Sequence, residues 1–385
     1  TEATSIQKIS LPAALTGKDI IVSAQTGSGK TAVFILPLIH RILTAKERHS
    51  APKVLILAPT RELAVQTHKV FKALARFTDL KSVLLIGGEP FKHQIAKLRS
   101  KPEVVIATPG RLVEHIEKDH ADLTELDMLV FDEADRMLDM GFADAIQKVV
   151  VQCSPRRQSL LFSATLKHKD YKTIEGTLKN PLRIQLAQNV GHNSRILQQR
   201  VLVDSDKHKE ALVASLIAEE QVRRVIVFCN TRIQAERLSH VLRYKKLKAA
   251  YIHGEVSQNQ RKQIMNRFLD SKIHVLVATD LAARGLDIDD IGLVINFTVP
   301  NSGDEYTHRI GRCGRAGQPG KAISLVSAAE WNRMSSIERY LKIRCQPRRV
   351  ESLPTLYKGP KKVKKSGKAC GKPKRKASAK RNTNK

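Results

Sequence analysis

The chain has 385 residues, which is more than a single hydrophobic core normally supports, so its length predicts two domains. It opens with polar residues rather than a signal peptide, and no apolar run is long enough to span a bilayer. The first residue is not Met, which indicates a fragment of a longer protein. The absence of a long apolar run argues against a membrane-spanning protein.

Five cysteines are spread along the chain, and none forms a Cys-x-x-Cys pair. An odd number of isolated cysteines argues against a zinc site and against a disulfide framework. The pattern favours a reducing compartment, so we expect a cytoplasmic protein. A monomer is expected.

The net charge of +30 is unevenly distributed. Residues 351–385 carry 13 Lys and Arg against one Glu, a net charge of +12, which leaves +18 for the other 350 residues. A basic tail alone is a common aid to solubility, but a basic body as well indicates a polyanionic partner. Nucleic acid is the expected partner.

Short β-branched runs alternate with helical stretches, which is the pattern of a parallel sheet covered by helices. The fold class is therefore α/β. Strands are expected in the first half at 19–24, 53–58, 82–86, 103–107, 127–132 and 159–163, and in the second half at 200–203, 224–229, 249–253, 274–278, 292–297 and 321–326.

The two halves of the chain resemble each other. VLILAPTREL at 54–63 and VIVFCNTRIQ at 225–234 both read as a strand, then Thr-Arg, then a helix. This echo favours two α/β domains of common descent. We predict a first domain at 1–186, a linker at 187–198, a second domain at 199–350 and a disordered Lys-rich tail at 351–385.

The segment AQTGSGKT at 24–31 follows a strand and opens a helix, which is the context that a phosphate-binding loop requires. Glycines let backbone amides turn towards phosphates, and the helix N-terminus adds a favourable dipole. Lys30 would reach the β- and γ-phosphates, and the Thr31 hydroxyl would hold Mg²⁺. The alternative is an ordinary glycine-rich turn. The expected nucleotide-binding residues here are Ala24, Gln25, Thr26, Gly27, Ser28, Gly29, Lys30 and Thr31.

A second acidic group is needed for the metal, and MLVFDEAD at 128–135 supplies one at the end of an apolar strand. Asp132 suits direct or indirect coordination of Mg²⁺, and Glu133 could orient and deprotonate an attacking water. Taken alone, the acidic pair could equally be the solvated start of a helix. Together with the loop at 24–31 it predicts nucleotide hydrolysis.

The string DEAD, with QTGSGKT before it and SAT at 163–165 after it, resembles the DEAD-box RNA helicase family. The resemblance covers essentially all of residues 1–345 and about ten ordered motifs. It implies two tandem RecA-like domains, ATP and Mg²⁺ as cofactors, and RNA as the partner. Within the family, DEADRMLDMGF at 132–142 and the Lys-rich tail look most like bacterial ribosome-assembly helicases of the SrmB type.

The resemblance implies roles for residues whose chemistry alone is ambiguous. Gln7 resembles the glutamine that reads adenine, although the six residues before it lack the aromatic that the family stacks on the base. The implied RNA-backbone contacts of the first domain are Thr60, Arg61, Gly88, Thr108 and Arg111, and Ser163 and Thr165 would couple hydrolysis to RNA release. Singly, each of these is an ordinary strand-end turn or cap.

The second half carries the matching motifs. Thr231, Thr279, Arg284 and Gly285 are implied RNA contacts, and Asp287 would meet the ribose of the nucleotide. In HRIGRCGRAG at 308–317, Arg312 and Arg315 would share one face of a helix and serve as arginine fingers on the γ-phosphate. His308 would bridge to the SAT segment.

The expected function is therefore an ATP-dependent RNA helicase that separates or remodels short duplexes or ribonucleoproteins, in ribosome large-subunit assembly. One alternative is an ATP-gated RNA clamp with little unwinding, and another is a DNA translocase with the same core. The tail is expected to add phosphate affinity that is independent of sequence and weakens with salt.

Overall fold

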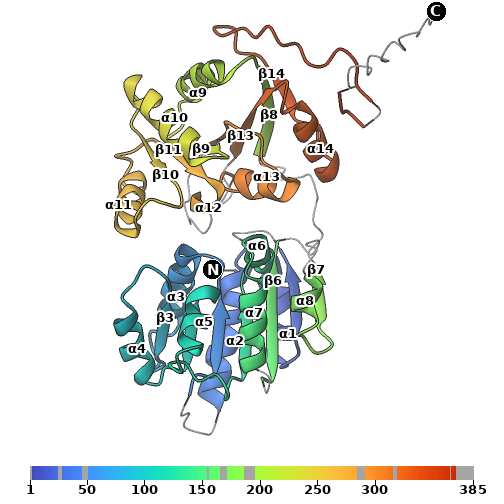
Figure 1. The fold of residues 1–385 in the computed structure, drawn as a ribbon. Coiled ribbons are helices and arrows are strands. Elements are labelled where there is room, and N and C mark those ends of the chain that lie inside the picture. Colours follow the sequence, from blue (N-terminus) through green and yellow to red (C-terminus); the bar gives the residue numbers. More distant parts are fainter. Residues whose placement is uncertain are drawn as a thin grey trace, which may run out of the picture. The chain divides into compact units, whose positions relative to one another are not determined.

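The computed structural model describes residues 2–24, 28–45, 51–153, 156–164, 171–185, 196–283, 291–314, 319–364 and 366–369. The chain divides into two compact units, the first formed chiefly by residues 1–189 and the second chiefly by residues 190–385. Each unit is a seven-stranded sheet with helices on its faces (Figure 1). No helix among the described residues is long and apolar enough to cross a membrane.

The first unit contains a sheet in the order β3-β4-β2-β5-β6-β1-β7, and every pairing is parallel. Its elements in chain order are α1 (Ser5–Leu15), β1 (Ile20–Ser23), α2 (Lys30–Thr44), β2 (Val54–Leu57), α3 (Arg61–Leu74), β3 (Ser82–Leu85), α4 (Phe91–Arg99), β4 (Val104–Ala107), α5 (Pro109–Ile116), β5 (Met128–Phe131), α6 (Ala134–Asp139), α7 (Ala143–Gln152), β6 (Gln158–Ser163), α8 (Tyr171–Glu175) and β7 (Leu182–Gln185).

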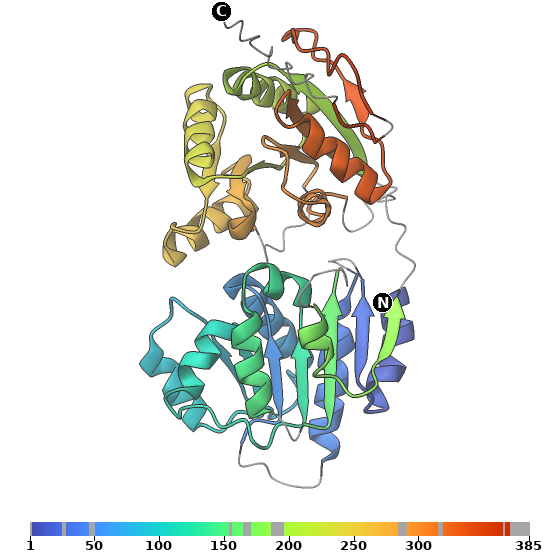
Figure 2. The same ribbon diagram turned by 45° about the vertical axis from the view of Figure 1, so that its right-hand side comes forward.

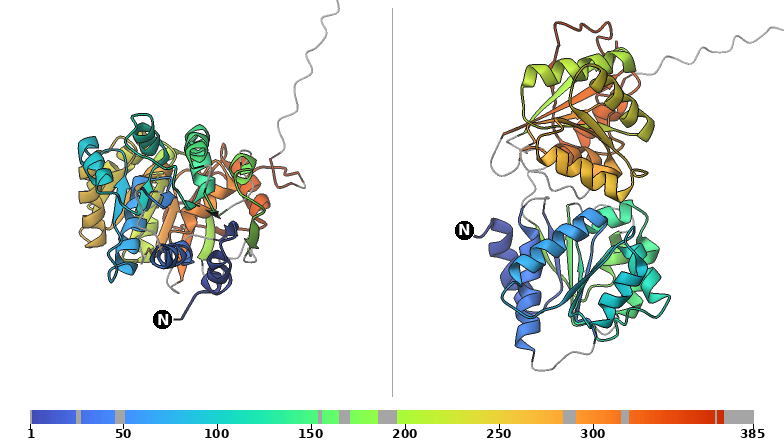
Figure 3. Two further views of the ribbon diagram at one scale, coloured as in Figure 1. Left: turned by 90° about the horizontal axis from the view of Figure 1, so that it is seen from below. Right: turned by 90° about the vertical axis from the view of Figure 1, so that its left-hand side faces the viewer.

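Strands β2, β4 and β5 of this sheet are apolar and buried at every position because both faces of the sheet are covered. Successive side chains of a strand point to opposite faces. Accordingly, Ile20 and Val22 pack with α1, α2 and α3, while Ile21 packs in a separate core with α4 to α8. The right-hand view of Figure 3 shows these two groups of helices, in blue and in green, on opposite sides of the first sheet.

The second unit repeats the same strand order, as β10-β11-β9-β12-β13-β8-β14, again with parallel pairings. Position for position, β1 corresponds to β8, β2 to β9 and β5 to β12, so the internal echo in the sequence is confirmed as a repeated topology. The elements are β8 (Ile196–Val203), α9 (Asp206–Glu220), β9 (Val225–Cys229), α10 (Arg232–Tyr244), β10 (Ala249–Ile252), α11 (Gln258–Leu269), β11 (Val275–Thr279), α12 (Asp280–Ala283), β12 (Leu293–Asn296), α13 (Gly303–Ile310), β13 (Gly320–Ser327), α14 (Trp331–Leu341) and β14 (Gln346–Arg348).

All twelve strands expected from the sequence are present, with ends that differ by a few residues. Two further strands, β7 and β14, were not predicted. Both lie at the edge of a sheet and are largely exposed, so neither carries the buried apolar run that marks the central strands. The largest error at a strand end concerns β8, which begins at Ile196 rather than at position 200.

Two predicted boundaries need correction. Residues 196–198, assigned to the linker, are the first residues of β8; residues 187–195 of the predicted linker lie outside the described residues. Disorder was expected from position 351, but the chain there is bound to the second unit. The Asp204 carboxylate accepts hydrogen bonds from the backbone amides of Leu356 and Tyr357, at 2.9 and 2.7 Å. These bonds, with that of Leu356 the largest cause, lower the pKa of the Asp204 carboxyl.

Candidate nucleotide and RNA site

The sequence-predicted site residues that the structure describes in the first unit lie at one edge of its sheet. Because all the strands are parallel, their carboxyl ends meet at that edge, where α6 begins (Figure 2). The strand order places β6 between β1 and β5. The segment 28–31 after β1, Ser163 at the end of β6 and Asp132 after β5 are therefore brought to neighbouring strand ends.

Lys30 is the best-defined member of the nucleotide loop. Gly29 caps helix α2 with a φ of 89°, a left-handed conformation that favours glycine. Lys30 then begins the helix; it is 6% exposed, and its Nζ donates a 2.7 Å hydrogen bond to the carbonyl oxygen of Ala24. The turn thus folds the lysine back over the loop, and Thr31 follows in the first turn of the helix.

Helix α1 is fastened to the same loop by two polar side chains. Gln7 Nε2 donates to the carbonyl oxygen of Gly29 at 3.1 Å, while Gln7 Oε1 accepts from the backbone amide of Thr4 at 2.9 Å. The Thr4 hydroxyl donates to the carbonyl oxygen of Ser28 at 2.9 Å. Gln7, which the sequence predicts to read adenine, is therefore bonded to the nucleotide loop through Gly29. The contact of Thr4 with this loop was not predicted. The sequence feature that could have indicated it is the position of Thr4 three residues before Gln7, as the N-cap residue of α1.

Asp132 and Glu133 are both buried at the end of β5. Burial is the main cause that raises the pKa of the Asp132 carboxyl, to about 7; the charge of Glu133 adds to it, while Lys30 and Arg136 oppose it. Glu133 has a φ of 54°, which is left-handed and uncommon for a residue with a side chain. Its Oε2 accepts a 2.8 Å bond from buried Arg136 Nη1. Two carboxylates are thus held side by side, with cations next to them.

Asp132→Asn is expected to stabilise the first unit increasingly as the pH rises. An unfolded aspartate ionises near 3.8, whereas folded Asp132 keeps its proton up to about pH 7. Below pH 3.8, ionisation of Asp132 therefore does not change the free energy of unfolding. Between pH 3.8 and 7 it lowers this free energy by an increasing amount, and above pH 7 by a constant amount. Calorimetry without nucleotide or Mg²⁺ should give a larger gain in Tm at pH 8 than at pH 5. The same gain at both values would contradict this account.

The expected RNA contacts of the first unit surround the ends of β2, β3 and β4. Thr60 caps α3 by accepting from the amide of Leu63 at 3.2 Å. The Arg61 guanidinium lies over the glycine pair that follows β3, and a Cβ built on Gly87 would be 2.8 Å from its Nη2. Gly88 has a φ of 80°, and an added Cβ there would collide with Arg61 as well. This close approach of Arg61 explains why residues without a side chain occupy both positions.

Thr108 and Arg111 lie at the start of α5. Thr108 is the N-cap residue and is buried. The Arg111 side chain is held by Glu114, at 3.1 Å from Nε, and by the carbonyl oxygen of Glu89, at 3.3 Å from Nη1. It also lies over the ring of Phe91. Arg111 is therefore fixed in place rather than free in solvent.

The second unit places four of its predicted residues, namely Thr231, Thr279, His308 and Arg312, at the corresponding edge. Thr231 caps α10 by accepting from the amide of Gln234 at 3.3 Å, as Thr60 does for α3. Thr279 ends β11, His308 lies partly buried in α13, and Arg312 follows α13 with 4% of its surface exposed. Eight predicted residues lie outside the described residues, namely Gln25, Thr26, Gly27, Thr165, Arg284, Gly285, Asp287 and Arg315.

Sequence reasoning missed a buried cluster around Arg309. The Arg309 guanidinium is 1% exposed and makes two bonds with the Asp280 carboxylate, at 2.7 and 2.6 Å. It also donates to Asn230 Oδ1 and to the carbonyl oxygen of Thr298, each at 2.7 Å. These partners follow the adjacent strands β9, β11 and β12. The sequence does show a polar residue after each of these three strands, but only the strand order shows that these polar residues meet.

The two units differ at the point where the first has its nucleotide loop. There the second unit has Asp204 and Ser205 at the end of β8, and Ser205 caps α9. A carboxylate at this position repels phosphate. It is instead used by residues 355–357, which donate to it. The repeated fold thus carries a phosphate-loop candidate in the first unit only.

Comparison with known proteins finds one family model for each unit. Residues 4–174 match the family described as DEAD/DEAH box helicase, and residues 207–317 match the helicase conserved C-terminal domain. The chain is 40% identical over 362 residues to the ATP-dependent RNA helicase SrmB of Haemophilus influenzae, covering 93% of this chain and 82% of that protein. It is 39% identical over 364 residues to the ATP-dependent rRNA helicase RRP3 of Candida albicans, covering 94% of this chain and 66% of that protein.

Among solved structures, Saccharomyces cerevisiae Dbp5 bound to RNA and ADP BeF3 matches with a TM-score of 0.82 and 28% identity, covering 90% of each chain. The fold and site therefore define a helicase core of two tandem RecA-like domains. The chain belongs to the DEAD-box family of ATP-dependent RNA helicases. It is an enzyme that binds RNA and hydrolyses ATP.

Proposed function

We propose that this helicase separates or remodels short RNA duplexes or ribonucleoproteins, and that ATP hydrolysis resets it after each event. The observation that carries the proposal is the gathering of Lys30, Asp132 and Glu133 at one edge of the first sheet. A buried lysine beside two buried carboxylates suits a metal-bound triphosphate, because the lysine meets phosphate oxygens and the carboxylates meet the metal and the water.

Mg²⁺ fits the donor set of this site. Magnesium prefers hard oxygen ligands and is commonly held by one or two carboxylates together with substrate phosphates. The carboxylate of Asp132 and the hydroxyl of Thr31 are such ligands, and a bound cation would offset the burial that now favours the protonated form of Asp132. Bound magnesium would neutralise charge developing on the phosphates. Glu133 would accept the proton of the attacking water.

The second unit would complete the nucleotide site. We propose that Arg312 and Arg315 act as arginine fingers and that Asp287 meets the ribose, while Gln7 reads adenine. ATP and RNA would then each favour one closed state of the two units, which makes their binding reciprocally coupled. Support comes from the repeated topology: the phosphate-loop candidate occurs only in the first unit, and the arginine-rich segment after α13 only in the second.

RNA stimulation of ATP hydrolysis tests this proposal. The rate should rise with single-stranded RNA and much less with DNA of equal length and sequence, because the RNA branch of these motifs recognises a backbone bearing 2′-hydroxyls. Equal stimulation by both would favour a DNA translocase. ATP-dependent RNA retention without strand separation, measured on a short labelled duplex, would favour a clamp.

The proposed target is a ribosomal RNA precursor, specifically in large-subunit assembly. Support comes from the relative named as an rRNA helicase and from the likeness to SrmB. Crosslinking the protein to RNA in cells and sequencing the bound fragments tests the target. Reads concentrated in large-subunit rRNA would agree, and reads spread over messenger RNA would contradict it. The cytoplasm is the proposed compartment, since Cys153, Cys229 and Cys345 are buried as thiols rather than joined in disulfides.

A further inference from the structure

The single tryptophan holds the C-terminal segment against α14. Trp331 Nε1 and Ser335 Oγ both donate to the carbonyl oxygen of Gly367, at 3.0 and 3.1 Å. From the residue that follows Trp331, Asn332 Oδ1 accepts a 2.7 Å hydrogen bond from the amide of Ala369. Three side chains of one helix therefore bind the backbone of residues 367–369, independently of the contact at Asp204.

The segment held in this way is a small closed turn. The amide of Lys364 donates to the carbonyl oxygen of Lys368, and the amide of Gly367 to that of Lys364, both at 2.8 Å. Val363 and Ala369 form an antiparallel bridge across it. Gly367 has a φ of 75°, which a residue with a side chain rarely adopts. We call residues 358–369 the basic turn.

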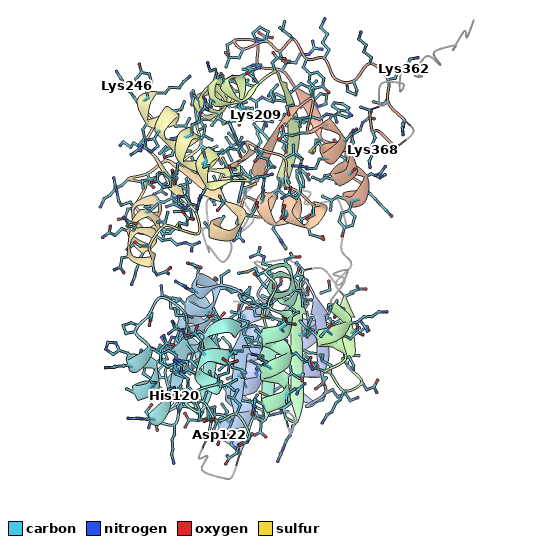
Figure 4. The ribbon with its side chains drawn as sticks, viewed as in Figure 1. His120, Asp122, Lys209, Lys246, Lys362 and Lys368 are labelled. Carbon is cyan, nitrogen blue, oxygen red and sulfur yellow. The ribbon has the colours of Figure 1, made fainter. Side chains whose placement is uncertain are left out.

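The basic turn carries only positive charge. It contains lysines at 358, 361, 362, 364, 365 and 368 and no acidic residue. Lys358, Lys361, Lys362 and Lys364 are exposed, and none of them, nor Lys368, has an acidic partner among the residues that the structure describes. Figure 4 labels Lys362 and Lys368 on this segment, beside α14.

We propose that the basic turn is a fixed phosphate-binding surface of the second unit, latched by Trp331 and Ser335, which binds the RNA backbone outside the helicase motifs. This inference rests on the proposed RNA-remodelling function and names a further RNA-binding surface for it. Lysines are compact point charges suited to phosphate, and backbone contacts of this kind carry little sequence information. The surface therefore fits RNA flanking the remodelled duplex.

The bonds from Trp331 and Ser335 to Gly367, which we call the latch, matter because they change the entropic cost of binding RNA. A free lysine-rich tail must be ordered when it meets RNA, and that entropy is subtracted from the electrostatic gain. Lys364 and Lys368 lie on the closed turn, and Lys358, Lys361 and Lys362 lie between it and the contact of Tyr357 with Asp204, so the backbone that carries these lysines is already held at both ends. The surface should therefore bind RNA more tightly than the same number of lysines on an unanchored chain. That difference separates a fixed surface from a tail acting as a loose tether.

A latch variant leaves the charge of the protein unchanged. Trp331→Phe combined with Ser335→Ala removes both donors to Gly367 and keeps an aromatic ring. RNA affinity at low salt is expected to fall about threefold to tenfold, the scale of ordering a few residues. Hydrogen exchange at the amides of Gly367 and Ala369 should rise. The matched control is Ser336→Ala, because Ser336 Oγ donates within α14, to the carbonyl oxygen of Asn332, and bonds no other residue in the part of the chain that the structure describes.

A charge series tests the same inference without touching the latch. One variant replaces Lys358, Lys361, Lys362 and Lys364 by Gln, and its partner replaces Lys372, Lys374, Lys376 and Lys380, which follow the basic turn in the sequence. For single-stranded RNA the slope of log affinity against log salt should drop by about 3 in the first variant and by clearly less in the second.

Equal losses in the two charge variants, together with an unaffected latch variant, would overturn the inference in favour of a tether. No loss in either charge variant would overturn it too, and would leave the turn free for an acidic protein. ATP turnover at saturating RNA is measured on every variant and should not change. Absence of RNA stimulation in the unchanged protein would instead refute the proposed function, so the two failures are distinguishable.

Discussion

Glu133→Gln is expected to lower ATP turnover by about 10²- to 10⁴-fold, the range that general acid–base catalysis typically contributes. Glu133 is held in place by its backbone conformation and by Arg136, at 2.8 Å from its Oε2. Glutamine keeps an oxygen that accepts from Arg136, but it cannot take a proton from water. ATP and RNA binding should therefore persist, and the variant should accumulate with both bound. Steady-state hydrolysis and equilibrium binding check this.

A matched control is Glu117→Gln, which removes the charge from an exposed pair with Lys148. Its turnover should stay within about twofold of the unchanged protein, because an exposed ion pair contributes little. If Glu133→Gln also hydrolyses ATP at nearly the unchanged rate, another group is the base and the role assigned to Glu133 is wrong.

Arg309→Ala is expected to destabilise the second unit by about 3–5 kcal/mol, the usual cost of breaking a buried ion pair from one side. The change leaves Asp280 without its two short bonds and leaves the carbonyl oxygen of Thr298 and the amide oxygen of Asn230 without this donor. Trp331 is the only tryptophan and lies in the second unit, so its fluorescence during urea unfolding reports this unit selectively.

Two further variants sharpen the test at Arg309. Arg309→Lys should rescue little, because an ammonium cannot reproduce the planar fork that meets Asp280 with two nitrogens. Arg333→Ala is the control: this exposed arginine makes a single 3.2 Å bond to the carbonyl oxygen of Val299. A loss below about 1 kcal/mol for Arg309→Ala would mean that the cluster is not a structural centre.

Prediction from the sequence succeeded where a residue pattern is local. The buried strand Met128–Phe131 is apolar throughout, and the acids that follow it mark a strand end. Gly29 and Lys30 mark the turn from loop to helix by their own conformational preferences. The edge strands β7 and β14 were not predicted because they are largely exposed and therefore lack a continuous apolar run. Lysine content alone predicted disorder at 358–369, since the bonds that hold this turn come from α14.

The sequence by itself determined the class of this protein: an α/β chain of two similar halves, with a loop for phosphate and acids for a metal in the first half. Those features depend on short-range chemistry, namely strand periodicity, glycine in a turn, and an acid at a strand end. Tertiary structure decided which distant residues meet. Arg309 joins Asp280 and Asn230 only because β11 and β9 are neighbours, and Trp331 meets Gly367 only because the chain returns to α14. Such pairings depend on strand order and chain path, which no local pattern specifies.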